Sequence, residues 1–241
     1  MNNKKIGITL GDINGIGIEV VVKALNKLKD VSNIVLFGSK SVFDYHIEFL
    51  KLKAHFKYEF VNLDNDENLE KVNKTVNWGK NEANSGFISF YSLKKAIDYA
   101  NENKIGAIVT APTSKTAMNT AGFHFSGQTE ILQKYIKNKS ENENNAQMLF
   151  CTNEGFRVLL LTRHLSLKDV PKAINKDMII KNVIEINDIL INDFKINNPK
   201  IKNYCDEIEK LLKELKAIDK ATVSIHLANM GGGVFEVFTI P

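Results

Sequence analysis

The sequence predicts an α/β protein in which a sheet is flanked by helices. Short apolar runs typical of strands alternate with amphipathic runs typical of helices through the first two thirds of the chain. The first strand-like run ends in a glycine-rich turn that leads straight into a helix-like run. The chain has 241 residues, of which 44% are hydrophobic and 25% charged, so it can bury one large core or two modest ones.

The chain opens with a strand, a turn and a helix. Lys5–Leu10 has the pattern of a strand, Gly11–Gly17 that of a turn, and Ile18–Leu25 that of a helix. Such a turn places backbone N–H groups and the Asp12 carboxylate at the carboxyl edge of a sheet, where α/β proteins usually bind ligands. Its glycine spacing, G-x-x-x-G-x-G, matches neither the dinucleotide fingerprint nor the phosphate-binding loop, so the turn alone identifies no ligand.

Further strands and helices are predicted before residue 111. The polar, asparagine-rich stretch of residues 62–84 has no clear period and is predicted to be a surface excursion containing Trp78, whose role the sequence does not reveal. The last strand of this part is apolar throughout, as expected where both faces of a parallel sheet are covered. In chain order we expect a strand at Asn33–Gly38, a helix capped by Ser39 that ends near Leu50, a strand at Phe56–Val61, a helix capped by Ser85 that ends near Asn101, and a strand at Ile105–Thr110.

The alternation continues beyond residue 111. Ala111–Lys115 follows a strand end directly, and Gly122–Glu130 opens another helix. The remaining expected elements are strands at Ala146–Thr152 and Phe156–Leu161 joined by a hairpin turn, helices at Lys176–Phe194 and Tyr204–Ala217, and strands at Ala221–Leu227 and Val234–Thr239.

Composition argues against several classes of function. The 32 basic and 28 acidic residues are interspersed, so the net charge of +4 gives no nucleic-acid-binding footprint. No apolar run approaches the roughly 18 residues that a membrane span needs, and the N-terminus leads into a strand instead of a signal peptide. Cys151 and Cys205 have no C-x-x-C spacing and are expected to be unpaired thiols of a reducing compartment, so we expect the protein in the cytoplasm.

Four residues beside predicted strand ends or helix starts are candidates for substrate binding or catalysis. Asp12 can contact a ligand hydroxyl, or it can simply stabilise its own turn through backbone N–H groups. Lys115 can hold a phosphate or carboxylate or polarise a carbonyl, although an exposed lysine without a task is the alternative. Gln128 and Thr129 follow Gly127 at a predicted helix start, where they can offer an amide, a hydroxyl and free N–H groups to an anion, or form an ordinary helix cap.

His164 is the candidate metal ligand. It follows a predicted strand, so its imidazole can bind a metal or exchange a proton. A structural role is the alternative, because zinc-type sites usually have three or four protein donors. No Ser-His-Asp order and no G-x-S-x-G nucleophile elbow is present, so hydrolysis by a serine nucleophile is not expected. The other histidines add little: His46 and His55 flank a helix end, His124 lies in a turn, and His226 lies in the C-terminal part.

Four segments carry distinctive residue patterns, namely Ile8–Glu19, Val109–Lys115, Ala121–Glu130 and Arg157–Val170. In this order they resemble the 4-hydroxythreonine-4-phosphate dehydrogenase family of pyridoxal phosphate biosynthesis. The resemblance covers about residues 5–200 and implies an isocitrate-dehydrogenase-like α/β fold, with a three-layer arrangement of sheet and flanking helices. It leaves residues 201–241 as a divergent helix with two short strands, so the C-terminal part of the family is truncated or replaced.

The resemblance also implies an activity. Members of the family are oxidoreductases that act as homodimers, use NAD and a divalent metal such as zinc, magnesium or cobalt, and oxidise the secondary alcohol of a small phosphorylated substrate. The resulting β-keto acid then loses carbon dioxide. His164 matches the first of three metal histidines, Gln128 and Thr129 match a substrate-contacting His-Thr pair, and Lys115 and Asp12 match loop residues around the same cleft.

The chain departs from the family in two respects. Gln128 replaces a histidine, which keeps hydrogen bonding but removes protonation and imidazole ligation at that position. The later segments of the family, with two metal histidines, the phosphate-binding residues and most of the NAD pocket, have no counterpart after Lys200. Two alternatives therefore stay open: a catalytically silent domain that binds a small anion or a partner, and a phosphate acyltransferase, which would need coenzyme A and no metal histidine.

Overall fold

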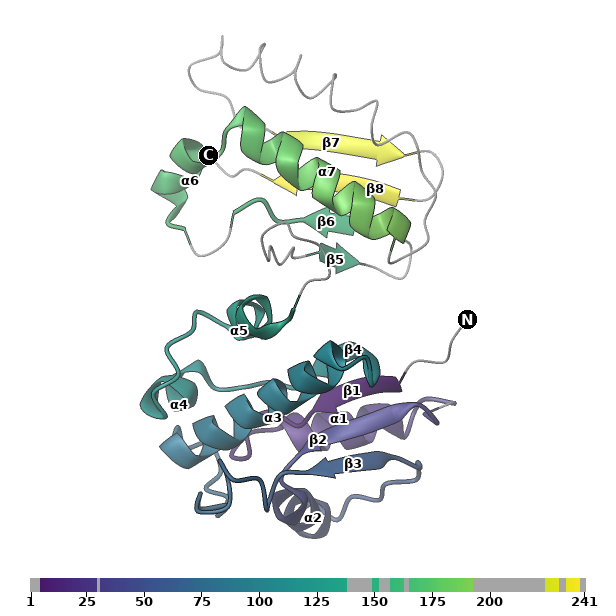
Figure 1. Ribbon diagram of the computed structural model, residues 1–241, viewed down its shortest axis with the longest axis vertical. Helices are drawn as coiled ribbons and strands as arrows, with labels where there is room; N and C mark the ends of the chain where they lie inside the picture. Colours follow the sequence, from purple (N-terminus) through teal and green to yellow (C-terminus); the bar gives the residue numbers. More distant parts are fainter. Residues whose placement is uncertain are drawn as a thin grey trace. The chain divides into compact units, whose positions relative to one another are not determined.

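The computed structural model describes residues 5–29, 31–137, 149–151, 157–162, 165–192, 224–229 and 233–238. The chain forms two compact units, Met1–Ala146 and Gln147–Pro241 (Figure 1). The predicted boundary at residue 200 separates the part of the chain that resembles the family from a divergent part, and it stays a prediction.

The first unit is built on a parallel sheet of four strands in the order β3-β2-β1-β4. Thr9 of β1 pairs with Phe37 of β2 on one side and with Thr110 of β4 on the other. The strand order therefore reverses beside β1, so the carboxyl ends of β1 and β4 flank the topological switch point of the sheet. The strands are β1 (Lys5–Thr9), β2 (Ile34–Gly38), β3 (Glu59–Asn62) and β4 (Ile105–Thr110).

Helices cover both faces of this sheet. In Figure 1, α3 lies in front of the sheet and α1 lies behind it. Val35 and Phe37 of β2 pack with Ala96 of α3, whereas Leu36 packs in a cluster with Val22 of α1. The predicted α/β class, a parallel sheet with flanking helices, is confirmed. The helices of this unit are α1 (Gly17–Leu25), α2 (Lys40–Phe49), α3 (Ala83–Asn101), α4 (Lys115–Thr120) and α5 (Gln128–Tyr135).

The strands differ in how well they are covered. All five residues of β2 are buried, because this strand is paired on both sides and has helices on both faces. β4 lies at the edge of the sheet, and Val109 is 51% exposed although Ile105 is buried. The prediction that Ile105–Thr110 is covered on both faces is therefore wrong for the described structure, since apolar composition does not distinguish a central strand from an edge strand.

Two predicted helix caps have different outcomes. Ser39 caps α2 as expected, and its Oγ accepts a hydrogen bond from the Val42 N–H at 3.3 Å. Ser85 is not the cap of α3, because the helix begins earlier, at Ala83, and the Ser85 hydroxyl donates to the Glu82 carbonyl at 3.0 Å. The capping pattern thus identified the helix but misplaced its start by one turn or less.

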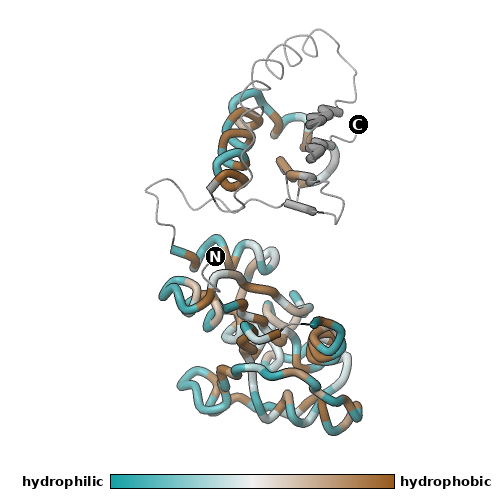
Figure 2. Tube along the Cα trace, turned by 90° about the vertical axis from the view of Figure 1, so that its right-hand side faces the viewer, coloured by the Kyte–Doolittle hydropathy of each residue, from teal (hydrophilic) through white to brown (hydrophobic). Residues whose placement is uncertain are grey.

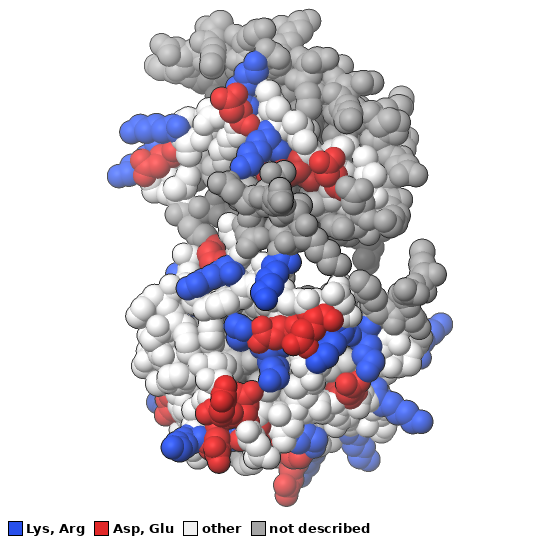
Figure 3. Space-filling view, in the orientation of Figure 1, with Lys and Arg blue, Asp and Glu red and all other residues white. Residues whose placement is uncertain are grey.

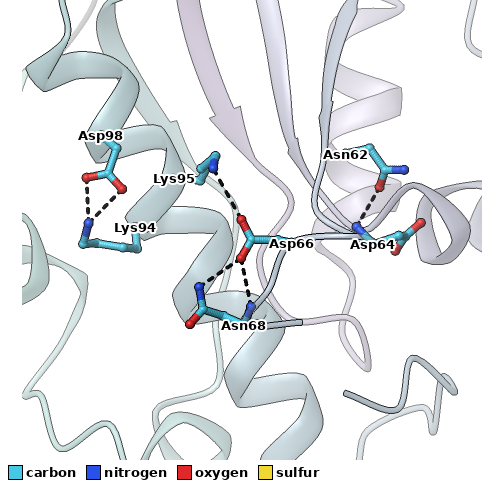
Figure 4. Close-up of polar contacts among 7 residues, drawn as sticks. All are labelled: Asn62, Asp64, Asp66, Asn68, Lys94, Lys95 and Asp98. Carbon is cyan, nitrogen blue, oxygen red and sulfur yellow. Dashed lines mark hydrogen bonds and ion pairs between the residues drawn. The ribbon is translucent and has the colours of Figure 1, made fainter. Parts of the chain in front are cut away.

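The predicted surface excursion after β3 is partly integrated into the core. Leu63 and Leu69 are buried at 1% and 0% exposure. Asp66 lies between them and accepts hydrogen bonds from Lys95 of α3 at 3.4 Å and from the Asn68 side chain at 3.0 Å (Figure 4). Burial raises the pKa of the Asp66 carboxyl, but the hydrogen bonds from Asn68 and Lys95 outweigh it and hold that pKa below its usual value.

The second unit has a mixed sheet in the order β5-β6-β8-β7. β5 and β6 are antiparallel, β6 and β8 are parallel, and β7 and β8 are antiparallel. α7 shows alternating hydrophobic and hydrophilic bands along its length (Figure 2), and Ile179, Val183, Ile186 and Leu190 form its buried stripe. The elements are β5 (Leu149–Cys151), β6 (Arg157–Leu159), a 3₁₀ turn at Leu167–Asp169, α6 (Val170–Ala173), α7 (Lys176–Asn192), β7 (Ser224–Asn229) and β8 (Gly233–Phe238).

The predicted strands and the long helix of this unit are confirmed in kind. The predicted helix Tyr204–Ala217, the turn at residues 153–155 and Cys205 lie outside the described residues. In the part of the chain that the structure describes, no helix is long and apolar enough to cross a membrane.

Gly86 offers a test of the contact between α3 and α4. A Cβ at this position would lie 2.1 Å from the carbonyl oxygen of Ala117. Glycine to alanine inside a helix normally stabilises by roughly 0.5–1 kcal/mol, but here the overlap with backbone reverses the sign. We expect Gly86→Ala to lower the free energy of unfolding by about 1–3 kcal/mol, measured by urea denaturation.

Gly15→Ala is the matched control, because its Cβ would meet only Asp12, at 3.5 Å. This variant should change the free energy of unfolding by less than about 1 kcal/mol. A Gly86→Ala protein as stable as the parent would contradict the close helix contact.

Candidate functional site

The turns that follow β1 and β4 touch each other at the switch point. The Asp12 N–H donates to the Pro112 carbonyl at 3.0 Å, and the Ala111 N–H donates to the Thr9 carbonyl at 3.1 Å. Gly11 has a φ of 73°, and a Cβ there would lie 2.2 Å from the Pro112 oxygen. Only glycine fits this approach, so the two turns lie in direct contact at the switch point, where α/β proteins usually bind ligands.

Asp12 serves as a turn stabiliser in this structure. Its side chain is 9% exposed, and Oδ1 accepts a hydrogen bond from the Asn14 N–H at 2.9 Å. This is the Asx-turn role that the sequence left open as an alternative. A contact between Asp12 and a ligand stays a prediction.

Gln128 joins the start of α5 to the turn after β4. Its Nε2 donates to the Thr113 hydroxyl at 3.0 Å and to the Ala111 carbonyl at 3.3 Å. Its Oε1 is buried and has no hydrogen-bond partner among the described residues. A buried acceptor without a partner is costly, so this oxygen is a candidate acceptor for a ligand O–H or N–H group.

Lys115 and Thr129 start the two helices that flank this turn. Lys115 is exposed at the first position of α4, where the Ser114 Oγ accepts from the Ala117 N–H at 3.1 Å. Thr129 is the half-buried second residue of α5, and no side chain caps that helix because Gly127 is its N-cap. A Cβ at Gly127 would lie 3.3 Å from Glu130 Oε2, so the Glu130 carboxylate lies near the N-terminus of α5.

Charge is sparse on one part of the surface shown. In Figure 3 the area over the α4 end of the first unit is mostly uncharged, and basic and acidic side chains intermingle elsewhere on that unit. This view shows no extended patch of a single sign among the described residues, in agreement with the interspersed charges of the sequence.

The predicted metal ligand cannot be compared with these residues. His164 lies outside the described residues, so its convergence with Gln128 and Thr129 stays a prediction. Elsewhere, the described parts of the chain contain no group of three or more His, Cys, Asp or Glu side chains that could hold a metal ion. The described residues therefore do not fit a complete metal site, and they assign no NAD contact.

His46 is a residue of this region that sequence reasoning missed. It is fully buried on α2, its Nε2 lies 2.9 Å from the Ile13 carbonyl, and the Trp78 ring packs against it at 4.5 Å between centroids. Burial lowers the pKa of His46, and the hydrogen bond to Ile13 and the charge of Asp12 offset this only in part. The neutral imidazole therefore donates to the turn after β1 and supports it from α2.

The family model described as pyridoxal phosphate biosynthetic protein PdxA matches residues 30–203. The chain belongs to this family. Two curated relatives are the 4-hydroxythreonine-4-phosphate dehydrogenases of Bacteroides thetaiotaomicron, 33% identical over 74% of this chain and 50% of the relative, and of Aquifex aeolicus, 31% identical over 75% of this chain and 56% of the relative. The chain thus spans about half the length of the curated relatives it matches.

Solved structures of PdxA-type enzymes support the same fold. The 4-hydroxythreonine-4-phosphate dehydrogenase of Burkholderia phymatum has a TM-score of 0.62 at 14% identity, covering 98% of this chain and 89% of that chain. The enzyme of the same name from Klebsiella pneumoniae has a TM-score of 0.60 at 22% identity, covering 75% of this chain and 57% of that chain. At these identities the likeness concerns the fold alone.

The buried imidazole predicts a pH dependence of stability. Because the pKa of His46 in the folded state is below its ordinary value of 6.5, the unfolded chain binds the proton more readily, and stability present above pH 6.5 is lost as the pH falls below it. His46→Gln can still donate to the Ile13 carbonyl but does not titrate. Below pH 6.5 we expect the unfolding free energy of the parent to fall by up to about 1.4 kcal/mol per pH unit through this group. The His46→Gln variant should not show this loss.

Urea denaturation at pH 7.5 and pH 5.5 measures this difference. His124→Gln, which removes an exposed histidine of the same unit, is the control for the loss of a histidine as such. Identical pH dependence in the parent and His46→Gln would show that His46 is not held neutral.

Proposed function

We propose that this PdxA-family protein oxidises the secondary alcohol of 4-phosphohydroxy-L-threonine, or of a related phosphorylated hydroxy acid, in pyridoxal phosphate biosynthesis. The proposal includes NAD and a divalent metal, followed by loss of carbon dioxide from the β-keto acid product. The observation that carries it is the family match over residues 30–203, which includes the Lys115 and Gln128 turns at the switch point. A homodimer and a cytoplasmic location are part of the same proposal.

The side chains beside the turn after β4 would bind and orient this substrate. Lys115 offers a positive charge to the phosphate or carboxylate, and it is exposed at the start of α4. Gln128 offers its partnerless Oε1 to a substrate hydroxyl, with its Nε2 fixed on Thr113. Because an amide neither gains nor loses a proton near neutral pH, Gln128 would orient the substrate without acting as an acid or base.

The cofactors would supply the redox and Lewis-acid chemistry. NAD, when bound, accepts the hydride, and a divalent cation stabilises negative charge on the substrate oxygen. Zinc, magnesium and cobalt are the candidate metals, with His164 as the proposed ligand in this chain.

The identity of residue 128 bears on the choice of substrate. A relative from Fusobacterium nucleatum, 31% identical over 74% of this chain and 55% of its own length, is named as a proposed D-threonate 4-phosphate dehydrogenase. Both D-threonate 4-phosphate and phosphohydroxythreonine carry a phosphate and a secondary alcohol, and they differ in the group beside that alcohol. A site with a neutral amide in place of an imidazole can distinguish such groups by hydrogen bonding.

A direct assay tests the proposed reaction. Purified protein is mixed with NAD, either substrate and one of zinc, magnesium or cobalt, and reduced cofactor is followed by absorbance. Turnover of either substrate supports the proposal. The absence of turnover with all three metals overturns it. Stoichiometric substrate binding without turnover would instead support the silent anion-binding domain.

Lys115 provides a test of the substrate-binding role. Lys115→Met keeps the length of the side chain and removes its charge. A hydrogen bond to a charged group contributes about 1.5–3 kcal/mol, so kcat/KM should fall by roughly 10- to 150-fold. Steady-state kinetics measures the loss, and Lys27→Met, an exposed lysine beyond the end of α1, should leave kcat/KM unchanged.

A further inference from the structure

Residues 77–82, which lie in the excursion whose role the sequence did not reveal, form hydrogen bonds with both turns at the switch point. This segment precedes α3 and contacts the turn after β1 through Asn14 and the turn after β4 through Asn81. The two contacted turns are those that carry Asp12 and Lys115. A connection that bridges both sides of a switch point can fix the distance between them.

Asn14 holds the first end of the segment through both the N–H and the C=O group of its side-chain amide. It is 2% exposed, its Nδ2 donates to the Lys80 carbonyl at 2.9 Å, and its Oδ1 accepts from the Asn77 N–H at 2.8 Å. The Asn14 carbonyl also accepts from the Gly79 N–H at 2.8 Å. Each of these groups is satisfied by the segment, so the turn and the segment form one hydrogen-bonded unit.

Glu82 reinforces this end. Its carboxylate accepts from Asn77 Nδ2 at 2.9 Å and from Asn14 Nδ2 at 3.3 Å, while its backbone carbonyl accepts from the Ser85 hydroxyl at 3.0 Å. Glu82 is also the residue that precedes α3, so the segment is fixed to the helix that covers one face of the sheet. The segment is therefore anchored to two elements before it reaches the second turn.

Asn81 makes the contact at the second turn. Its Oδ1 accepts from the Ser114 hydroxyl at 2.5 Å. The same Ser114 oxygen accepts from the Ala117 N–H at 3.1 Å and thereby caps α4, whose first residue is Lys115. The position of the Lys115 backbone is thus coupled to Asn81 through one serine side chain.

We infer that Asn77–Glu82 is a brace that sets the separation of the two turns, with Asn14 and Asn81 as positioning residues that act on the substrate through Lys115. This inference rests on the proposed function of Lys115. The brace itself is a structural connection that can be measured without turnover.

The chain contains matched controls for both residues. Asn26 makes the same kind of clamp as Asn14, donating to the Lys53 carbonyl at 2.6 Å and accepting from the His55 N–H at 2.9 Å, but it follows the last residue of α1. Asn84 donates to the Asn73 carbonyl at 3.1 Å in the same region as Asn81, and among the described residues it makes no hydrogen bond with the second turn.

Kinetics of Asn81→Ala provides the first test. Asn81 is exposed, so the variant should fold with an unchanged melting temperature. We expect kcat/KM to fall about tenfold or more, because a small displacement of a substrate-binding group is enough for such a loss. Asn81→Asp keeps an acceptor for Ser114 and should restore most of the activity, whereas Asn84→Ala should match the parent.

A double-mutant cycle separates positioning from a general structural role. If Asn81 acts through Lys115, adding Asn81→Ala to Lys115→Met should cause less than about a twofold further loss of kcat/KM. Additive losses would overturn the inference. Asn14→Ala should behave like Asn81→Ala, with Asn26→Ala as its control, and Asn81→Ala alone is sufficient for the test if Asn14→Ala does not fold.

Hydrogen exchange followed by mass spectrometry tests the brace independently of activity. In Asn81→Ala the amides of residues 115–118 should exchange about threefold faster or more, while Asn84→Ala should leave them unchanged. If the parent shows no turnover but these amides exchange faster in Asn81→Ala than in the parent, the proposed function is refuted and the brace is supported. Equal exchange in Asn81→Ala, Asn84→Ala and the parent would refute the brace.

Discussion

The hydrogen bond from the Asp12 N–H to the Pro112 carbonyl is the contact on which the candidate site depends. It joins two turns separated by about 100 residues of chain, and it forms only because Gly11 adopts a left-handed conformation against the Pro112 oxygen. The parallel pairing of β1 with β4 brings the turns together, and this bond joins them directly. The contact between the two turns is a consequence of strand order combined with one residue that lacks a side chain.

Side-chain amides provide much of the connection between the turns and their neighbours. Asn14, Asn26 and Asn101 each donate to one backbone carbonyl and accept from one backbone N–H of a distant segment. Gln128 makes a comparable contact with the turn after β4, but its Oε1 is left without a partner in the described structure. Amides suit this role because one side chain satisfies both a donor and an acceptor without a buried charge.

Membership of the PdxA family and the departures from it have different physical consequences. The likeness to solved structures agrees with the parallel sheet of the first unit. Gln128, whose amide donates to Thr113, keeps hydrogen-bonding capacity at the start of α5 and cannot titrate. The proposed choice among phosphorylated hydroxy acids therefore depends on hydrogen bonding at position 128.

The sequence by itself determined the kinds of elements and their order, because hydrophobic period and turn residues are local properties: β1, α2 with its Ser39 cap, β4 and α7 all follow from them. It also indicated Lys115 and Gln128, since both stand beside strand or helix ends. Only the tertiary structure decided that Val109 lies on an edge strand, that His46 is buried beneath Ile13, and that Asn81 reaches Ser114. Strand neighbours and contacts between distant turns depend on how the whole chain packs, and no local pattern encodes them.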